Sequence, residues 1–95
     1  MNKVIKDKLK ILIESRVGEF LVAARHLANK SRFEVSQQLG YENEKLVELY
    51  ELGNVPACEF MSLIALYDVA PPSVFDFLHD LQLEIEKIKV DDSSD

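Results

Sequence analysis

The fold of this chain is decided by residues 17–75, whose sequence is VGEFLVAARHLANKSRFEVSQQLGYENEKLVELYELGNVPACEFMSLIALYDVAPPSVF. Apolar residues recur in it every three or four positions, which is the spacing of helices that bury one face. Gly40 and Gly53 each follow such a run, and Pro71 and Pro72 follow another. Because glycines of this kind end helices and prolines interrupt them, the segment predicts short helices joined by tight connections.

The first three helices can be placed by their end signals. A first helix is expected over residues 2–15, and a second from residue 17 or 18 to about residue 29. Ser31 is a suitable N-cap for the third helix, because Glu34 follows it at the spacing of a capping box. Gly40 is expected to end that helix in the left-handed conformation.

The second half of the chain contains comparable signals. Asn43 is expected to cap a fourth helix and Gly53 to close it. Pro56 is expected in the first turn of a fifth helix, where its missing N–H costs little, and Ser73 at the start of the last helix. Residues 91–95 are predicted to be a disordered acidic tail. The apolar residues expected to face inward in the fourth helix are Leu46, Leu49 and Tyr50.

The composition limits the class of protein. The chain has 95 residues, of which 47% are hydrophobic and only three are Gly, so one compact and mostly helical domain is expected. No apolar stretch is long enough to span a membrane and lysines interrupt the N-terminal segment, so a cytoplasmic location is expected. Cys58, the only cysteine, is expected to be a buried structural thiol. His26 and His79 have no partners at metal-ligand spacing, so we expect no metal. The sequence offers no Gly-rich phosphate loop, no Ser/His/Asp set and no paired-carboxylate cleft, so we expect no cofactor and no enzymatic activity.

Four segments within residues 17–75 occur in a familiar order and spacing. They are VGEFLVAARHLANKSR (17–32), FEVSQQLG (33–40), LYELGNVP (49–56) and IALYDVAPPSVF (64–75). Together they resemble the phage-repressor-like helix-turn-helix family, the XRE or Cro/CI type. The resemblance covers about three fifths of the chain, and it implies a helix-turn-helix scaffold.

The expected fold class is therefore all-α. It comprises a five-helix repressor-like helix-turn-helix domain over residues 17–75 and an extra, basic amphipathic helix over residues 1–16. An extended C-terminal helix over residues 76–90 and the tail over residues 91–95 complete it.

The resemblance also locates the positions that contact DNA in such a family. Arg32 stands where a Gln is common, and the positions that usually contact bases align with Glu42, Asn43, Glu44, Lys45, Val47 and Glu48. Polar groups at helix starts can hold phosphates, and Asn and Lys can contact bases. The candidate DNA contacts are Ser31, Arg32, Asn43 and Lys45.

The charge distribution opposes this interpretation. The net charge is −6, and residues 33–95 hold fourteen Asp or Glu against three Lys or Arg, whereas residues 1–32 hold three against eight. DNA-binding proteins usually present a basic face to the phosphates. Two function classes follow: a DNA-binding transcriptional regulator acting as a homodimer, which the resemblance favours, and a protein-interaction module on the same scaffold that has lost DNA binding.

The last helix predicts self-association. Its apolar residues Val74, Leu78, Leu81, Ile85 and Ile88 recur at the 4-3 spacing of a heptad seam. Val74, Phe75 and Leu78 are expected in the domain core, and the rest of the seam needs a cover. We favour a homodimer through both terminal helices, with the N-terminal helix folding back within one chain as the alternative. The residues expected in this contact are Ile5, Leu9, Leu12, Leu81, Ile85 and Ile88.

Overall fold

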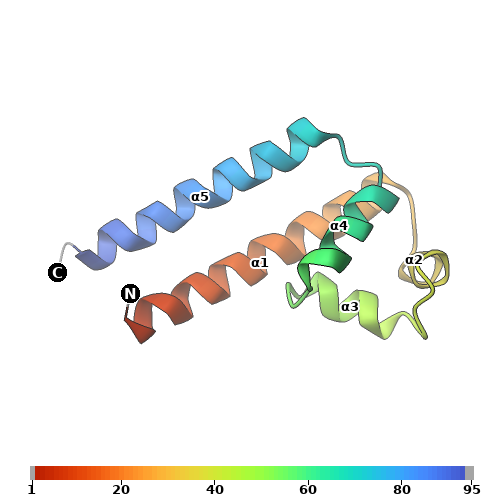
Figure 1. The fold of residues 1–95 in the computed structure, drawn as a ribbon, viewed down its shortest axis with the longest axis horizontal. Coiled ribbons are helices and arrows are strands. Elements are labelled where there is room, and N and C mark those ends of the chain that lie inside the picture. Colours follow the sequence, from red (N-terminus) through yellow and green to blue (C-terminus); the bar gives the residue numbers. More distant parts are fainter. Residues whose placement is uncertain (1, 94–95) are drawn as a thin grey trace.

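The computed structural model describes residues 2–93, and the side chains of residues 2–91. Within that range it contains five helices and no strand, so the prediction of an all-α fold is confirmed. The helices are α1 (Lys3–Leu27), α2 (Arg32–Gln38), α3 (Lys45–Glu51), α4 (Ala57–Leu66) and α5 (Pro71–Ser93). Figure 1 shows α1 and α5 running in opposite directions side by side, while the three short helices gather around the C-terminal half of α1.

The expected break between a helix over residues 2–15 and a second helix near residue 17 is absent, and that prediction was wrong. One helix of 25 residues runs from Lys3 to Leu27, capped at its start by Asn2, whose Oδ1 accepts a hydrogen bond of 2.9 Å from the Ile5 N–H. Gly18 is buried in the middle of this helix rather than opening a new one. A Cβ on Gly18 would lie 2.2 Å from the carbonyl oxygen of Glu51, so the glycine allows α3 to approach α1 closely.

The local end signals are mostly confirmed. Ser31 caps α2, and its capping box with Glu34 is complete in both directions. Gly40 and Gly53 have φ values of 73° and 96°, the left-handed conformation expected after α2 and α3. The Asn43 side chain accepts from the Lys45 N–H at 2.9 Å, although Glu44 occupies the cap position itself.

Two helix starts differ slightly from the prediction. Pro56 precedes α4 as its N-cap rather than lying in its first turn. The last helix begins at Pro71, two residues before Ser73, because the fixed φ of proline suits the first positions of a helix.

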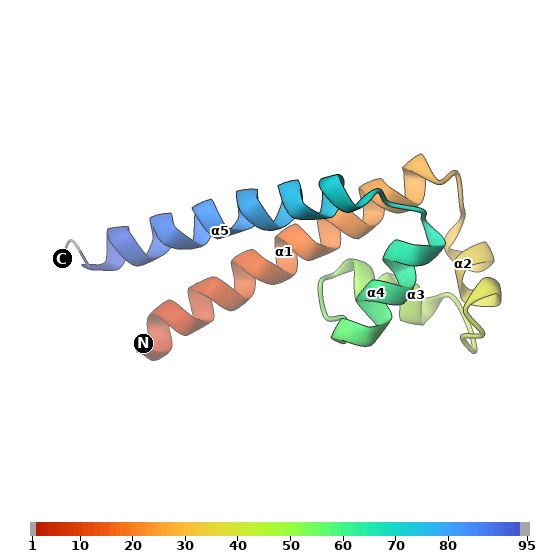
Figure 2. The same ribbon diagram turned by 45° about the horizontal axis from the view of Figure 1, so that its top comes forward.

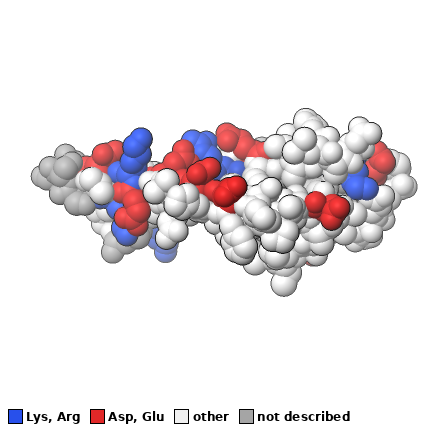
Figure 3. Space-filling model, turned by 90° about the horizontal axis from the view of Figure 1, so that it is seen from above, with Lys and Arg blue, Asp and Glu red and all other residues white. Residues whose placement is uncertain are grey.

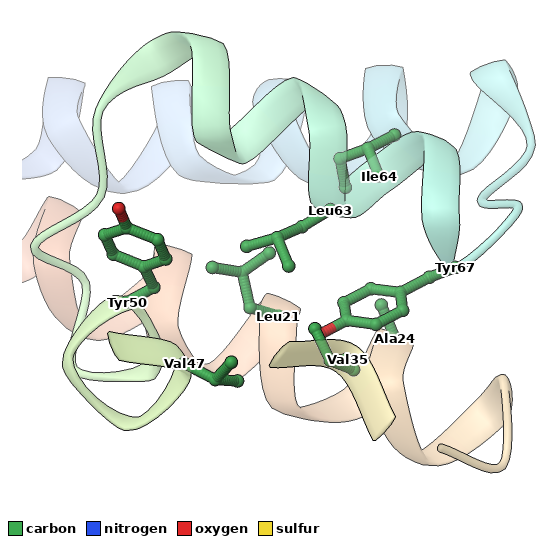
Figure 4. Packing of buried hydrophobic residues seen from close by; sticks show 8 residues of the cluster. All are labelled: Leu21, Ala24, Val35, Val47, Tyr50, Leu63, Ile64 and Tyr67. Carbon is green, nitrogen blue, oxygen red and sulfur yellow. The ribbon is translucent and has the colours of Figure 1, made fainter. Parts of the chain in front are cut away.

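The core lies between α1 and the three short helices (Figure 4). Leu21, Val35, Val47 and Leu63, one from each of these helices, are the most completely buried large side chains. The burial of Val47 corrects the alignment that placed it among exposed base-contacting positions. Burying such side chains supplies most of the stability of a small domain.

The helix α5 presents most of the predicted seam inward, since Val74 packs against the core, Leu81 is buried, and Ile85 and Ile88 are half-buried. Phe77 stacks on Phe20 with ring centroids 4.3 Å apart, and Leu81 is buried. Phe75 and Leu78, both expected in the core, are 68% and 49% exposed. Phe77 thus takes the inward place predicted for Leu78, because the aromatic ring of Phe20 on α1 provides a partner at that position.

Two further expectations were wrong. The predicted disordered tail is helical as far as Ser93, since α5 continues through residues 91–93, and residues 94–95 lie outside the described part. Cys58 is exposed in the first turn of α4 rather than buried.

The paired long helices make the molecule elongated. Its extents are 49 × 27 × 19 Å and its radius of gyration is 15.0 Å, against about 12 Å for a compact domain of this length. Figure 2 shows the N-terminal half of α1 and the C-terminal half of α5 extending together beyond the short helices. We call this part of the molecule the arm, comprising residues 3–13 of α1 and 83–93 of α5.

Candidate functional site

The candidate site is formed by α2, α3 and the connections around them. The turn between α2 and α3 depends on Gly40, whose left-handed conformation allows the Tyr41 N–H to reach the Ser36 carbonyl at 2.8 Å. The Tyr41 hydroxyl donates to Glu59 of α4, and its ring meets Tyr50 edge-on at 5.9 Å. These contacts fix the direction in which α3 leaves the turn.

A buried ion pair fixes α3 against α1. The Arg25 Nε donates to the Glu51 Oε2 at 2.6 Å, and both side chains are less than a tenth exposed. The Arg25 guanidinium also donates to the carbonyl oxygen of Lys30 at 3.0 Å. A buried charge pair is stable only when its remaining polar groups are satisfied, and this set of bonds satisfies them.

Arg32, a candidate DNA contact, takes part in the same cluster. Its Nε donates to the Glu51 Oε1 at 2.8 Å, and Glu48 lies 4.0 Å from another of its nitrogens. The hydrogen bond to Glu51 is the main reason that the pKa of Arg32 is raised. The Arg32 side chain is half-buried, and two carboxylates of α3 balance its charge.

The other three candidate DNA contacts have mixed surroundings. Ser31 is exposed, but its hydroxyl accepts from the Glu34 N–H at 3.1 Å, and this capping box lowers the pKa of Glu34. The Asn43 Oδ1 accepts a hydrogen bond from the Lys45 N–H. Lys45 is exposed, and no hydrogen bond or ion pair of its ammonium group occurs in the described part of the chain. Arg32 lies near the C-terminal half of α3, and Asn43 and Lys45 lie at its start.

Two leucines lie on the surface of α3 that faces solvent. Leu49 is 41% exposed and Leu52, directly after the helix, is 73% exposed. With Lys45 and Glu48 they form what we call the α3 outer face, because the residues opposite them, Val47, Tyr50 and Glu51, are buried. Leu49 was expected to face inward in this helix, so its exposure corrects that prediction, and Leu52 was not among the predicted site residues.

The residues expected in a dimer contact lie between α1 and α5 of one chain. Leu9 and Leu81 are buried there, and Ile5, Leu12, Ile85 and Ile88 are half-buried. Leu12 and Ile88 line a common groove between the two helices. The seam is thus covered within the chain, which was the alternative to a contact with a second copy.

Charge is distributed unevenly over the molecule. Seen from the α5 side, blue and red side chains mix along the arm, whereas the opposite half is mostly uncharged (Figure 3). Arg16 pairs with Glu84 across α1 and α5 at 2.8 Å, which raises the pKa of Arg16 and lowers that of Glu84. The exposed acids around α2 and α3 are Glu34, Glu42, Glu44 and Glu48.

No protein-family model, curated protein or solved structure matches this chain. None of the described helices is both long enough and apolar enough to cross a membrane. The described residues also contain no cluster of three or more His, Cys, Asp or Glu that could hold a metal ion.

Proposed function

We propose that this chain is a protein-interaction module of the helix-turn-helix type, which binds protein through the α3 outer face and does not bind DNA. The observation that carries the proposal is the pairing of Arg32 with Glu51 and Glu48, beside two exposed leucines. An apolar centre with a charged rim is the usual composition of a protein interface.

Electrostatics oppose DNA at this surface. A carboxylate held about 4 Å from a phosphate costs on the order of 1 kcal/mol even with water-like screening. Glu48 belongs to the α3 outer face and Glu44 lies beside it, and the ammonium group of Lys45 is the only cation there without a paired carboxylate in the described structure. Counterion release from phosphates would thus supply little affinity.

The proposal is tested by fluorescence anisotropy of a labelled DNA duplex at about 50 mM salt. The wild-type protein is expected to give no binding at tens of micromolar. The double variant Glu44→Lys/Glu48→Lys is expected to gain salt-dependent, non-specific affinity, because it replaces two repulsive charges with attractive ones. The control variant Asp76→Lys/Glu86→Lys makes the same charge change on α5 and should gain less. Specific wild-type binding that survives competitor DNA would overturn the proposal.

The second candidate function is a DNA-binding transcriptional regulator acting as a homodimer. The resemblance of residues 17–75 to the repressor-like family favours it, as do the exposed Lys45 and the helix starts at Ser31 and Asn43. In that case Lys45→Ala and Arg32→Ala should weaken binding to DNA from the region upstream of the gene. Lys45→Ala is the cleaner test, because Lys45 is exposed and takes no part in the core.

A further inference from the structure

A stripe of small and apolar residues runs along the exposed side of α1, where Ile11 and Ser15 border the groove against α5, and Ser15 and Val22 border the groove against α3. Val4 and Ile11 are 60% and 70% exposed, and Ser15 and Val22 continue the stripe at intervals of four and seven residues. Residues at these intervals lie on one side of a helix. The stripe therefore extends from the arm to the level of α3.

The α3 outer face joins this stripe. A groove of about 440 Å³ lies between α1 and the end of α3, and its lining includes Ser15, Gly18, Val22 and Leu52. Leu52 thus lies beside Val22, and Leu49 follows on α3. The result is one continuous surface with Val4 and Ile11 at one end and Leu49 and Leu52 at the other.

The two ends of this surface differ in net charge, because the Val4 and Ile11 end has Lys3 and Lys10 with Asp7 between them, and the other end has Glu44 and Glu48 with Lys45 between them. Lys3 and Lys10 repeat with Glu14 at intervals of seven and four, and the backbone of Glu14 abuts Gly53 at the end of α3. Both exposed lysines therefore lie on the α3 side of α1, but out on the arm where no short helix covers them. At the other end, Glu44 and Glu48 flank the leucines.

We propose that this surface binds a second copy of the chain, with the two α1 helices antiparallel and the two-fold axis near Ser15. Such a rotation places the Val4 and Ile11 end of one copy against the Leu49 and Leu52 end of the other. The symmetry repeats this contact, so the dimer contains it twice. A two-fold interface requires a self-complementary surface of this kind. Lys3 and Lys10 of each copy then face Glu44 and Glu48 of the other. The inference rests on the proposed function, because it names the protein partner of the α3 outer face.

The contact would need only a modest part of the molecular surface. A stable protein interface buries about 800 Å² on each partner, roughly an eighth of the 6536 Å² exposed here. A helix of 25 residues is about 37 Å long, so α1 alone provides a long contact line. Opposite charges at the two ends fix an antiparallel arrangement and disfavour a parallel one.

The test is a charge swap read by sedimentation equilibrium between about 10 and 500 μM protein. The wild-type chain of 10.9 kDa is expected to approach twice that mass. Lys3→Glu/Lys10→Glu makes both ends acidic, and Glu44→Lys/Glu48→Lys makes both ends basic, so each variant alone should dimerise at least tenfold more weakly. Mixing the two variants restores both contacts, so a heterodimer should form with wild-type-like affinity.

Matched controls separate this contact from a general charge effect. Asp76→Lys/Glu86→Lys, on α5, should dimerise like the wild type, and circular dichroism checks that each variant remains helical. A monomeric wild type at 500 μM, variants that dimerise unchanged, or a mixture that stays monomeric would each overturn the dimer. Because DNA binding is measured separately, a monomer that binds no DNA contradicts this inference and leaves the proposed function intact.

Discussion

Glu51 links three parts of the chain through one carboxylate. It accepts hydrogen bonds from Arg25 of α1 and from Arg32 of α2, and its own backbone carbonyl abuts Gly18. The sequence contained these residues, but no local pattern connects a residue on the first helix with one 26 positions later. This cluster determines the electrostatics of the candidate site, because its carboxylates balance the charge of Arg32, whose side chain is 42% exposed.

Replacing Glu51→Gln is expected to destabilise the protein by about 3 kcal/mol or more, because it leaves the buried Arg25 without its charge partner. The exposed Glu48→Gln on the same helix should change the stability by less than about 0.5 kcal/mol. Urea denaturation followed by circular dichroism measures both. Equal stabilities for the two variants would show that the buried pair does not hold α3 in place.

Tyr67 and Tyr41 differ in their hydroxyl environment. The Tyr67 hydroxyl is buried and has no hydrogen-bond partner in the described part of the chain, whereas that of Tyr41 donates to Glu59. Tyr67→Phe should therefore leave the stability at neutral pH unchanged or raise it by about 1 kcal/mol, and Tyr41→Phe should lower it by about 1 kcal/mol. Thermal denaturation of both variants checks the contrast, and a larger loss for Tyr67→Phe would contradict it.

The buried Tyr67 hydroxyl also predicts that the stability of the protein falls at alkaline pH. Burial raises the pKa of Tyr67 to about 12, above the value of about 10 in an unfolded chain. Its contribution to stability is therefore complete below pH about 10 and is lost as the pH rises toward about 12. The wild type should lose stability relative to Tyr67→Phe over this range, measured by urea denaturation at each pH. Parallel curves for the two proteins would contradict the assignment.

The crossing of α1 and α3 depends on a glycine inside a helix. Gly18→Ala would normally stabilise a helix by about 1 kcal/mol, but here the new Cβ would lie 2.2 Å from the Glu51 carbonyl oxygen. We expect a net loss of about 1–3 kcal/mol from the overpacking. Ser15→Ala, on the same helix and exposed, should not destabilise it. Chemical denaturation compares the two, and a Gly18→Ala protein more stable than the wild type would contradict the close approach.

Helix ends and helix registers differed in how far the sequence predicted them. The capping box of Ser31 and the left-handed Gly40 involve neighbours within four residues, so the local pattern was sufficient. On α5 the choice between Phe77 and Leu78 was not predictable in this way, because each lies at helical spacing from both Val74 and Leu81. Only the position of Phe20, far away in the sequence, selects Phe77.

The ion pair between Arg16 and Glu84 predicts an acid response of the α1–α5 pair. The pKa of Glu84 is lowered mainly by its hydrogen bond from Arg16, so the pair stabilises the fold above the unfolded pKa of about 4.3. That contribution is lost as the pH falls through the lower pKa of the folded state. Glu84→Gln should be less stable at neutral pH and lose less on acidification, whereas Glu86→Gln should follow the wild type. Thermal melting between pH 7 and pH 3 measures this.

The elongated shape follows from the continuity of α1. A separate N-terminal helix was expected over residues 2–15 from its apolar spacing, with a second helix beginning at residue 17 or 18, whereas one helix runs through both. In the structure the basic N-terminal segment is a rigid extension of a core helix, and its lysines are held at a fixed place relative to α3. The basic N-terminal third of the sequence and its acidic remainder thereby contribute to opposite ends of one surface. Which residues share that surface follows only from the packing.

The most direct measurement of the central claim is an amide-resolved ¹H–¹⁵N NMR spectrum at about 50 mM salt, recorded with increasing protein and then with added DNA duplex. Raising the protein concentration is expected to shift the amides of Val4, Ile11, Val22, Leu49 and Leu52. Added DNA is expected to leave the amide chemical shifts of α2 and α3 unchanged. Shifts on DNA addition at Arg32, Asn43 and Lys45, with none on raising the protein concentration, would contradict a protein-binding role for the α3 outer face.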